Sequence, residues 1–594
     1  MDKKNLTIIL LLILFGASSI ANIILSIEVG TIKPVEQKKV VIAASYPGLA
    51  KNDPVDTWDQ ASMWHQQQVT EGLVYYDISK HPNYALVPRL AESWVWNNQT
   101  SITFQIREGV VFHDGTPLTA SAVKWNFDRL MWFSNESGLV ASNDTSKIGF
   151  SSSLYYLSNG TYLFDSFVAD DVNMEFTVIL NVPFGPLLDL LCFISTNIIS
   201  PGTHKFYEIV QLDEILVGTG PWKMKSHSPR REIRYERNGR WWGKAQYFEQ
   251  IIMQFVDDDI ERMDAGLAGQ YDYVSGVLKS YVDQFKVTEG MHVEDIGEGL
   301  GSYYLEIYCG PEDYNGDMII PGNYQYQRNN QTLRRALAYA LNYTYIIEVI
   351  QQGKAFYGVP IVPRSIPGYN NSIWHGYNES LTNGYNSSIK KAREIMKSIW
   401  PLAATWDTDY PGVNEAEWLT NDFKDIEINR YRLSSWMVYP ELRSLCGTSW
   451  RLIGIEFQDT ERPYSGNPLY VDFPDPWDVD VSFVKWGPDY LNPYNMIDPL
   501  FNLASGSCFS RINDTDLITL MEDAISETNY TAHLEEWAKI QSYIFDIKRP
   551  ENPSSHCFIP VYTYNTYQVH KTNLKGVNYN VLNILDTWNW YHEE

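Results

Sequence analysis

The sequence predicts a mixed α/β protein, and three observations support that fold class. Residues 40–44 form a short apolar run, VVIAA, which is typical of a buried strand. Residues 102–130 join a strand pattern, a turn and a helix pattern in one stretch. Both kinds of segment then alternate to the end, where residues 558–562 have the pattern of a strand returning to a core. Because 594 residues exceed what one core accommodates, we expect two to four domains, which need not be continuous in sequence.

The stretch from residue 102 to 130 is the clearest local unit. Residues 102–106 alternate apolar and polar side chains with the period of a half-buried strand. Residues 113–117, HDGTP, are turn formers, and Thr119 is expected to cap a helix with Val123 and Phe127 on its apolar face. None of these side chains is needed for catalysis or metal binding, so the unit is interpreted as structural.

Three later segments complete the expected elements. Residues 217–222, VGTGPW, predict a glycine turn that leads into a pair of strands. Residues 332 to about 352 have helical spacing, and Gly353 is expected to end that helix. Residues 357–386 are rich in Pro, Gly, Asn, Ser and Tyr, which predicts a long surface connection.

The N-terminus has the composition of a targeting or anchoring segment. Lys3 and Lys4 precede a stretch from residue 5 to 27 that is almost free of charge. This length is close to the ~20 residues that span a bilayer, while residues 19–21, SIA, offer a small-residue cleavage site. Residues 1–30 are therefore expected to be either a signal peptide or an N-terminal membrane anchor, and the sequence does not choose between them.

Composition sets the broad class of the protein. Hydrophobic residues make up 44% and charged residues 20% of the chain, as in a globular protein. The net charge is −26, so long-range repulsion from phosphate backbones argues against nucleic acid as a partner. We interpret the excess of acidic residues as a surface and solubility feature.

Glycosylation triplets and cysteines bear on export. Asn-x-Ser/Thr triplets, whose density agrees with an exported glycoprotein, begin at Asn98, Asn135, Asn143, Asn159, Asn330, Asn342, Asn370, Asn378, Asn386, Asn513 and Asn529. The five cysteines contain no C-x-x-C pair, which argues against a zinc or thioredoxin-type site. They allow one or two disulfides and leave at least one thiol.

No motif of an enzyme is present. The eleven histidines contain no H-E-x-x-H pair, and no G-x-S-x-G elbow occurs. The acidic residues are too numerous to single out a glycosidase pair. We therefore expect no catalytic residue, no metal and no cofactor, and we interpret His113 as structural.

Four blocks of sequence, in order, carry a family resemblance. They are residues 88–94 (PRLAESW) with 104–123, residues 218–222 (GTGPW) with 236–238 and 241–243 (WWG), residues 333–342 (LRRALAYALN), and residues 486–493 (WGPDYLNP). Together they resemble the extracytoplasmic solute-binding proteins of family 5, the oligopeptide- and dipeptide-binding components of ABC importers. The similarity runs from about Val40 to the end. Ser121, Asn342 and Asn492 stand where the family usually has an acidic residue.

The resemblance implies a class II periplasmic-binding-protein-like fold, with two α/β lobes around a ligand cleft plus an extra domain. Lobe 1 would comprise residues 40–71, 205–299 and 560–594, the extra domain residues 72–204, and lobe 2 residues 300–559. The chain would cross the hinge near Gly299 and Pro560. Ligand binding would close the lobes over the cleft.

The resemblance also implies where a ligand binds. In peptide-binding relatives the acid of the fourth block pairs with the ligand's α-ammonium group, so Asp489 is the first candidate. A carboxylate meets the need of a buried ammonium for a compensating charge. Trp486 and Tyr490 flank it and are expected to line the cleft. No motif identifies the cation for a peptide carboxylate, and the candidates are Arg364, Arg451 and Lys485.

The function implied is capture of di- to oligopeptides outside the cell and delivery to ABC permease subunits, which are powered by cytoplasmic ATPases. We expect a monomer at the outer face of the cytoplasmic membrane. The alternatives are an oligosaccharide-binding receptor of the same family, for which twenty tryptophans offer stacking platforms, and a membrane-anchored sensory receptor without transport. A secreted peptidase or glycosidase is the rival class, but it lacks a nucleophile or metal signature. The retained Asp489 favours peptides over sugars.

Overall fold

The structure is a computed structural model of the chain. It describes residues 38–46, 48–134, 150–228, 230–307, 309, 330–358, 361–370, 383–421, 423–431, 440–462, 481–505, 508, 510, 512–545 and 556–593. The predicted N-terminal targeting segment lies outside these residues, as do the triplets at Asn135, Asn143 and Asn378 and part of the predicted surface connection. Among the described residues, no helix combines the length and apolar character needed to cross a membrane.

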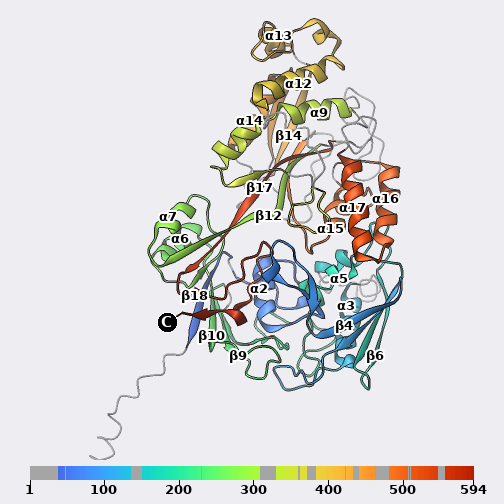
Figure 1. The fold of residues 1–594 in the computed structure, drawn as a ribbon, viewed down its shortest axis with the longest axis vertical. Helices are drawn as coiled ribbons and strands as arrows, with labels where there is room; N and C mark the ends of the chain where they lie inside the picture. The colour runs from blue at the N-terminus through green and yellow to red at the C-terminus, as the bar shows by residue number, and fades with distance from the viewer. Residues whose placement is uncertain are drawn as a thin grey trace, which may run out of the picture.

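One large mixed sheet extends through both halves of the molecule (Figure 1). Within the described residues its strands are ordered β15 (Ile455–Arg462), β14 (Lys424–Tyr431), β16 (Val481–Trp486), β12 (Met291–Ile307), β17 (Phe558–Lys571), β11 (Tyr273–Val274), β1 (Lys39–Ala44), β10 (Gln250–Phe255), β9 (Glu232–Arg237) and β8 (Trp222–Ser228), with β13 (Ala355–Tyr357) paired to β17. The expected first strand, the strand pair after the glycine turn and the returning strand near the end are β1, β8 with β9, and β17, so these three predictions are confirmed.

Strands β12 and β17 connect the two halves of the molecule. They run antiparallel from the upper part of Figure 1, where β12 pairs with β16, to the lower part, where β17 pairs with β11. Their pairing is interrupted between Glu298 and Ser302, where the register shifts. A regular ladder resists bending, so this break is the weakest point of the connection. It coincides with the sequence position where the hinge crossing is expected, near Gly299.

A second sheet with its own helix forms the lower right part of Figure 1. Its strands are ordered β4 (Ala91–Asn98), β5 (Ser101–Ile106), β7 (Glu175–Leu180) and β6 (Phe164–Asp170), and helix α3 (Ala120–Ser134) packs on β6 and β7. Thr119 caps α3, because its Oγ1 accepts the Ala122 N–H at 3.1 Å. Val123 and Phe127 are at most 1% exposed, which confirms the predicted strand, turn and helix.

The remaining α-helices and short strands lie outside these two sheets. They are β2 (Val74–Tyr76), β3 (Leu86–Pro88), β18 (Leu574–Lys575), β19 (Tyr591–His592), α2 (Gln60–Val69), α5 (Leu187–Leu190), α6 (Asp259–Leu267), α7 (Val282–Val287), α9 (Gln331–Ala340), α10 (Tyr343–Tyr345), α12 (Tyr385–Lys397), α13 (Glu415–Thr420), α14 (Pro440–Arg451), α15 (Pro493–Phe501), α16 (Thr515–Ser526) and α17 (Tyr530–Ile544). Helices α9, α12, α13 and α14 lie at the top of Figure 1, and α16 and α17 form its right-hand edge.

The helix expected over residues 332–352 is interrupted, so the prediction of one continuous helix is wrong. Helix α9 ends at Ala340, and Leu341 is extended with ψ 139°. The side chain of Asn342 then accepts the Tyr345 N–H at 3.0 Å and starts a new short helix. An asparagine that hydrogen-bonds nearby backbone competes with a continuing helix, and periodicity alone does not reveal this competition.

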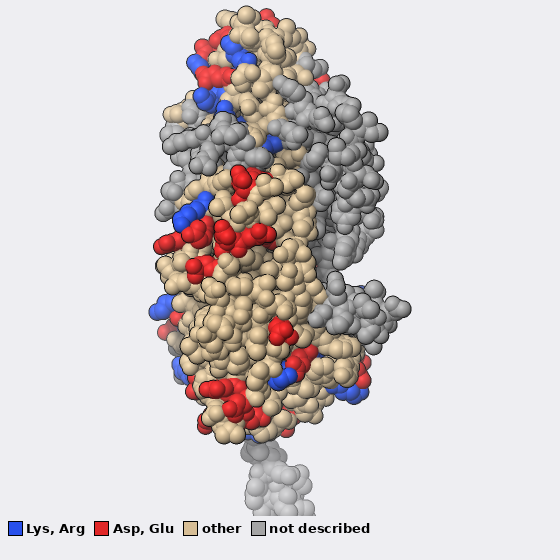
Figure 2. All heavy atoms as spheres, turned by 90° about the vertical axis from the view of Figure 1, so that its right-hand side faces the viewer, with Lys and Arg blue, Asp and Glu red and all other residues tan. Residues whose placement is uncertain are grey.

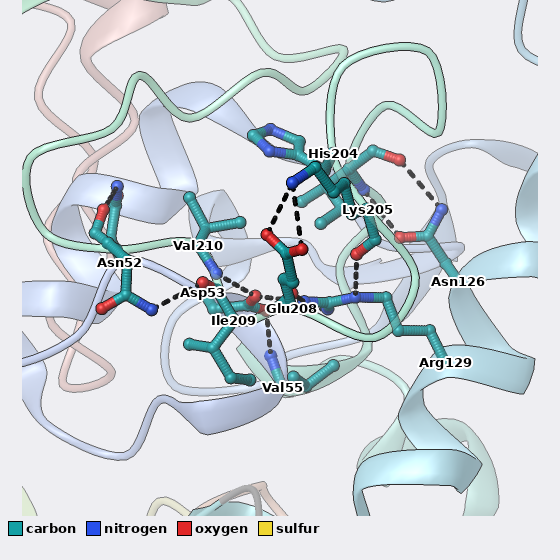
Figure 3. Close-up of polar contacts among 12 residues, drawn as sticks. Asn52, Asp53, Val55, Asn126, Arg129, His204, Lys205, Glu208, Ile209 and Val210 are labelled. Carbon is teal, nitrogen blue, oxygen red and sulfur yellow. Dashed lines mark hydrogen bonds and ion pairs between the residues drawn. The ribbon is translucent and has the colours of Figure 1, made fainter. Parts of the chain in front are cut away.

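A buried ion pair fixes α3 against the segment before α2 (Figure 3). Arg129 of α3 donates through Nη1 and Nη2 to the two carboxylate oxygens of Asp53, and both side chains are at most 1% exposed. Asp53 also accepts the backbone N–H groups of Val55 and Val210. Because every oxygen of this buried carboxylate is bonded, the pair holds the second sheet rigidly on the lower part of the main sheet.

The second sheet's region also contacts helices that follow β16. Gly185 N–H donates to the carbonyl of Ile525 at 2.7 Å, and Phe184 packs edge-on against Tyr494. The largest hydrophobic cluster runs without interruption from β5 and α3 into α15 and α17. Regions expected as the extra domain and lobe 2 therefore share a packed contact in this structure.

The face seen in Figure 2 carries groups of acidic side chains and few basic ones. The exposed acids on helices α16 and α17 include Asp516, Glu522, Asp523 and Glu535. Figure 2 shows acidic atoms gathered at the height of these helices, next to a broad uncharged area. This distribution agrees with the reading of the net charge of −26 as a surface property.

Candidate ligand-binding site

Asp489 lies between a strand of the upper half and the helix that follows it. Strand β16 ends at Trp486, opposite Ser302 of β12, and helix α15 begins at Pro493. Asn492 caps α15 by accepting the Tyr494 N–H at 3.0 Å, so Asn serves here as an N-cap where the family usually has an acid. The short turn after β16 thus carries Asp489 beside the register break that separates the two halves.

The carboxylate of Asp489 faces a residue from the other half of the chain. Trp58 donates from its indole Nε1 to Oδ1 at 2.5 Å, although the two residues are 431 positions apart. Asn495 donates from Nδ2 to Oδ2 at 3.3 Å, and its Oδ1 accepts the backbone N–H of Asp489 at 2.6 Å. Asn495, in the helix α15 that follows the turn, therefore orients Asp489, and Trp58 from the other half of the chain covers one carboxylate oxygen.

Only neutral groups compensate this carboxylate. Within the described residues, no lysine or arginine forms an ion pair with Asp489, and its bonded donors are an indole and an amide. Burial raises the pKa of Asp489 to about 6, and the hydrogen bonds from Trp58 and Asn495 counter only part of that increase. The residue as a whole is half-buried. A desolvated carboxylate without a counter-charge is suited to bind a cationic group, which supplies that charge.

The two aromatic residues predicted beside Asp489 differ in their environment. Trp486 is partly exposed, and its indole N–H points to the backbone carbonyl of Asn495 at 3.4 Å. Tyr490 is 2% exposed and belongs to the main hydrophobic core. Core packing explains the burial of Tyr490 without any ligand, whereas Trp486 retains exposed surface that is available for ligand contact.

The three candidate cations are separated by their contacts. Arg364 forms an ion pair with Glu298 at 2.8 Å, and Arg451 forms one with Glu456 at 3.6 Å. Lys485 lies on β16 next to Trp486, and burial lowers its pKa to about 8. Its Nζ is 5.8 Å from the ring centroid of Tyr303 and 5.3 Å from that of Tyr564. Aromatic faces stabilise a lysine without neutralising its charge.

Sequence reasoning missed the residues that approach from the other half. Trp58 belongs to none of the four blocks, and nothing in its neighbourhood marks it as a site residue. Tyr46, which hydrogen-bonds Gln60 at 2.8 Å, lies close enough to Tyr564 to interact electrostatically. Only the tertiary arrangement brings Trp58 to Asp489 and Tyr46 near Tyr564.

The first two sequence blocks meet at a different carboxylate, that of Glu71, which is 2% exposed. Arg89 of the first block forms an ion pair with it at 2.7 Å. From the second block, Thr219 donates to it at 2.9 Å, Trp242 at 3.0 Å and Trp241 at 3.3 Å. These blocks therefore build a structural junction, and none of their residues is brought to Asp489.

No metal centre is formed in the part of the chain that the structure describes. Histidine, cysteine, aspartate and glutamate side chains do not gather there in any group of three that could hold an ion. The candidate site is thus a set of charged and aromatic side chains.

The described geometry defines a class of protein. A sheet continuous through two halves, a separate four-stranded sheet and a carboxylate that faces across the halves are features of a periplasmic-type α/β solute-binding protein. The chain belongs to the bacterial extracellular solute-binding proteins, family 5, whose family model matches residues 85–507. The predicted family and fold class are confirmed.

Individual relatives agree with this assignment at low identity. The oligopeptide-binding protein OppA of Bacillus subtilis is 22% identical over 553 residues, covering 90% of this chain and 87% of that protein. The structure of HbpA2 from Haemophilus parasuis matches with a TM-score of 0.70 at 20% identity, covering 94% of this chain and all of that one. DppA from Helicobacter pylori, in complex with the peptide STSA, matches with a TM-score of 0.65 at 20% identity, over 95% of this chain and all of that one. Other relatives are named as binding heme, nickel or glutathione.

Proposed function

We propose that the protein is the extracytoplasmic substrate-binding component of an ABC importer and that it captures di- to oligopeptides with a free N-terminus. The single observation that carries the choice of peptide is the carboxylate of Asp489, which accepts hydrogen bonds from neutral donors on both halves of the chain and has no counter-charge among the described residues. A heme or a sugar offers no ammonium group for it. The relatives named as peptide-binding proteins support the same class of ligand.

Asp489 receives the peptide's α-ammonium group in this proposal. The ammonium would displace the Trp58 indole, which now occupies Oδ1 at 2.5 Å, and would supply the missing positive charge. A hydrogen bond between two charged groups in a desolvated site is stronger than the bond from a neutral indole that it replaces. Binding would therefore lower the pKa of Asp489 from about 6 and keep the carboxylate ionised.

Lys485 receives the peptide's carboxylate group. It precedes Asp489 by four positions, on the strand that leads to the same turn, and the rings of Tyr303 and Tyr564 hold its ammonium group. Trp486 would contact the ligand between these two charged ends through its exposed face, while Tyr490 would support the turn from the core.

Lobe closure accompanies capture. The proposed lobes are residues 40–71, 205–299 and 560–594 on one side and residues 300–559 on the other, with residues 72–204 as the extra domain. The register break in β12 at residues 298–302 supports a hinge there, because few ladder bonds oppose bending. The closed protein, as a monomer, would dock on permease subunits whose ATPases lie in the cytoplasm, and residues 1–30 would export or anchor it.

The test is a thermal-shift comparison of peptides with blocked and unblocked ends, because a ligand that binds only the native state raises its melting temperature. A tetrapeptide pool should stabilise the protein. N-acetylation should remove this shift in the wild type but change nothing further in Asp489→Asn. C-terminal amidation should weaken the shift in the wild type and change nothing further in Lys485→Gln.

A matched control and a contrary panel complete the experiment. Asp516→Asn changes an exposed acid on α16 and should respond as the wild type does. Oligosaccharides, heme and Ni²⁺ should leave the melting temperature unchanged. Stabilisation by oligosaccharides alone would overturn the proposal in favour of a sugar-binding receptor, and insensitivity to N-acetylation would overturn the role of Asp489.

A further inference from the structure

Three cysteines from distant parts of the chain meet at the upper ends of the two strands that connect the halves. The Ile307 N–H at the end of β12 donates to the carbonyl of Cys557 at 2.8 Å. The Cys309 N–H donates to the carbonyl of Ser510 at 2.6 Å, and Cys508 Sγ lies 3.8 Å from Ser510 Oγ. Backbone hydrogen bonds therefore hold residue 307 beside residue 557 and residue 309 beside residue 510.

The thiols of this cluster are buried and interact directly. Cys309, Cys508 and Cys557 are at most 2% exposed. The side chains of Cys309 and Cys557 are hydrogen-bonded to each other, and the Cys309 thiol also donates to the carbonyl of Ile307 at 3.2 Å. All five cysteines of the chain, these three included, are thiols in the structure, so neither of the disulfides allowed by the sequence is formed there.

We propose that Cys309 and Cys557 form a disulfide in the exported protein. Two thiol groups in hydrogen-bond contact, at the ends of two strands whose backbones are bonded through Ile307 and Cys557, need little movement to bring their sulfur atoms to bonding distance. A metal site is not the alternative, since no described group of His, Cys, Asp or Glu has metal-binding geometry. Disulfides persist in the oxidising surroundings of exported proteins. The inference rests on the proposed extracytoplasmic location and not on the identity of the ligand.

The bond forms by thiol–disulfide exchange with an external disulfide, from a thiol oxidoreductase or a small-molecule donor. One cysteine thiolate attacks the donor disulfide, which releases one donor thiol and leaves a mixed disulfide. The second cysteine attacks that mixed disulfide and releases the other donor thiol. The two cysteines lose two electrons and two protons in total, and the donor gains them. Because both sulfur atoms are buried in the folded chain, the exchange takes place before folding is complete.

The disulfide would clamp one end of the ribbon formed by β12 and β17. Cys557 immediately precedes β17, and Cys309 lies two residues after β12, on the side of the register break that faces β16. A clamp at this end keeps the two strands together where lobe 2 begins, while the irregular stretch at residues 298–302 stays able to bend. The link also closes a long loop of chain, which restricts the unfolded state.

The test maps the disulfides in the full chain after export to an oxidising extracytoplasmic compartment. Alkylation without reduction, followed by protease digestion and mass spectrometry, should give one peptide pair that links Cys309 to Cys557. Cys192, Cys446 and Cys508 should be alkylated. A link that includes Cys508, or alkylation of all five cysteines, would overturn the proposal.

Variants provide a second readout. Dithiothreitol should lower the melting temperature of the wild type and of Cys508→Ser by several degrees and should not change that of Cys309→Ser. Equal sensitivity in all three proteins would count against the bond. If Cys309→Ser does not fold, the mass-spectrometric mapping of disulfides in the wild type tests the proposed bond by itself. Peptide binding measured on the same wild-type sample tests the proposed function separately, because failure to bind would leave the mapped link unaffected.

Discussion

Glu71 and Asp489 are both desolvated carboxylates, but their surroundings are opposite. Glu71 is bonded by the guanidinium of Arg89, the hydroxyl of Thr219 and the indoles of Trp241 and Trp242. Asp489 is bonded by one indole and one amide, and no cation among the described residues pairs with it. The first arrangement satisfies the charge within the protein. The second arrangement leaves the charge of Asp489 without a charged partner in the described protein, so that a bound ligand can supply one.

The difference teaches how to separate structural from binding acids in this fold. Sequence blocks alone do not separate the two kinds of acid, because Arg89, which is the partner of Glu71, and Asp489 both belong to blocks that mark the family. Glu71 is 2% exposed and already has a counter-charge, so a ligand cannot reach it and would supply no missing charge there. Asp489 has partial exposure and a pKa raised by burial to about 6.

Asp189 shows that a missing counter-charge is insufficient without access. Burial raises its pKa to about 7, and it accepts hydrogen bonds from Tyr76 at 3.0 Å and from Asn492 at 2.8 Å. It is 1% exposed, between the second sheet's region and the turn before α15. Asp189 is therefore a buried contact inside the protein, and Asp489 alone of these three acids combines a missing counter-charge with a residue that is only half-buried.

Glu71→Ala should give the largest effect, a loss of about 3–5 kcal/mol in the free energy of unfolding, because Arg89 stays buried without its counter-charge. Urea unfolding followed by tryptophan fluorescence measures it. Asp489→Ala is the paired variant and should not lower stability, since no cation depends on it. Equal losses in both variants would remove the contrast between the two acids.

Asp489→Asn should lower peptide affinity by at least roughly 30-fold, or about 2 kcal/mol, because the ligand ammonium would enter a desolvated site without its counter-charge. Calorimetric titration with a tetrapeptide measures the change. Glu71→Gln, if folded, should bind normally. An affinity unchanged by Asp489→Asn would place the ammonium site elsewhere.

The pH dependence of stability should distinguish wild type from Asp489→Asn by about 1–2 kcal/mol. Folding raises the pKa of Asp489 from 3.8 to about 6, so the folded state holds its proton more tightly than the unfolded state does. This contribution therefore falls as pH rises from about 4 to 6 and is constant above that. Melting temperatures from pH 4 to 8 measure it, and parallel curves for the two proteins would contradict it.

Trp58→Phe should have the smallest effect, a gain of a few-fold in peptide affinity. The variant keeps an aromatic ring but removes the indole N–H that the ligand ammonium must displace, a hydrogen bond whose net contribution is about 1 kcal/mol. The same calorimetric titration measures it. A marked loss of affinity would mean that Trp58 donates to the ligand and does not compete with it.

Local structure was predictable wherever neighbouring residues specify it. The alternation in residues 102–106, the turn at 113–117 and the cap at Thr119 all act within a few positions, and β5 and α3 follow them. The helix expected over residues 332–352 failed at Asn342, because the side-chain cap formed there overrides the apolar period that continues past it.

The candidate site was predictable only in part, and from family resemblance instead of local residue patterns. Asp489 came from family resemblance, and its bonding confirms neither its role nor that of Trp486 and Tyr490, which stay predictions. Lys485 could be preferred over Arg364 and Arg451 only after the structure gave each its neighbours. Trp58 could not have been named, because its partner lies 431 positions away.

The sequence by itself determined the family, the α/β class and the local units, because these follow from side-chain period, turn residues and helix caps over short distances. Only the tertiary structure decided which carboxylate has a counter-charge. The charge balance of Glu71 and Asp489 depends on residues that are brought together by the main sheet and the second sheet from segments far apart in the chain. Burial and pairing, which set the pKa of an acid, are properties of that arrangement and not of its neighbours in sequence.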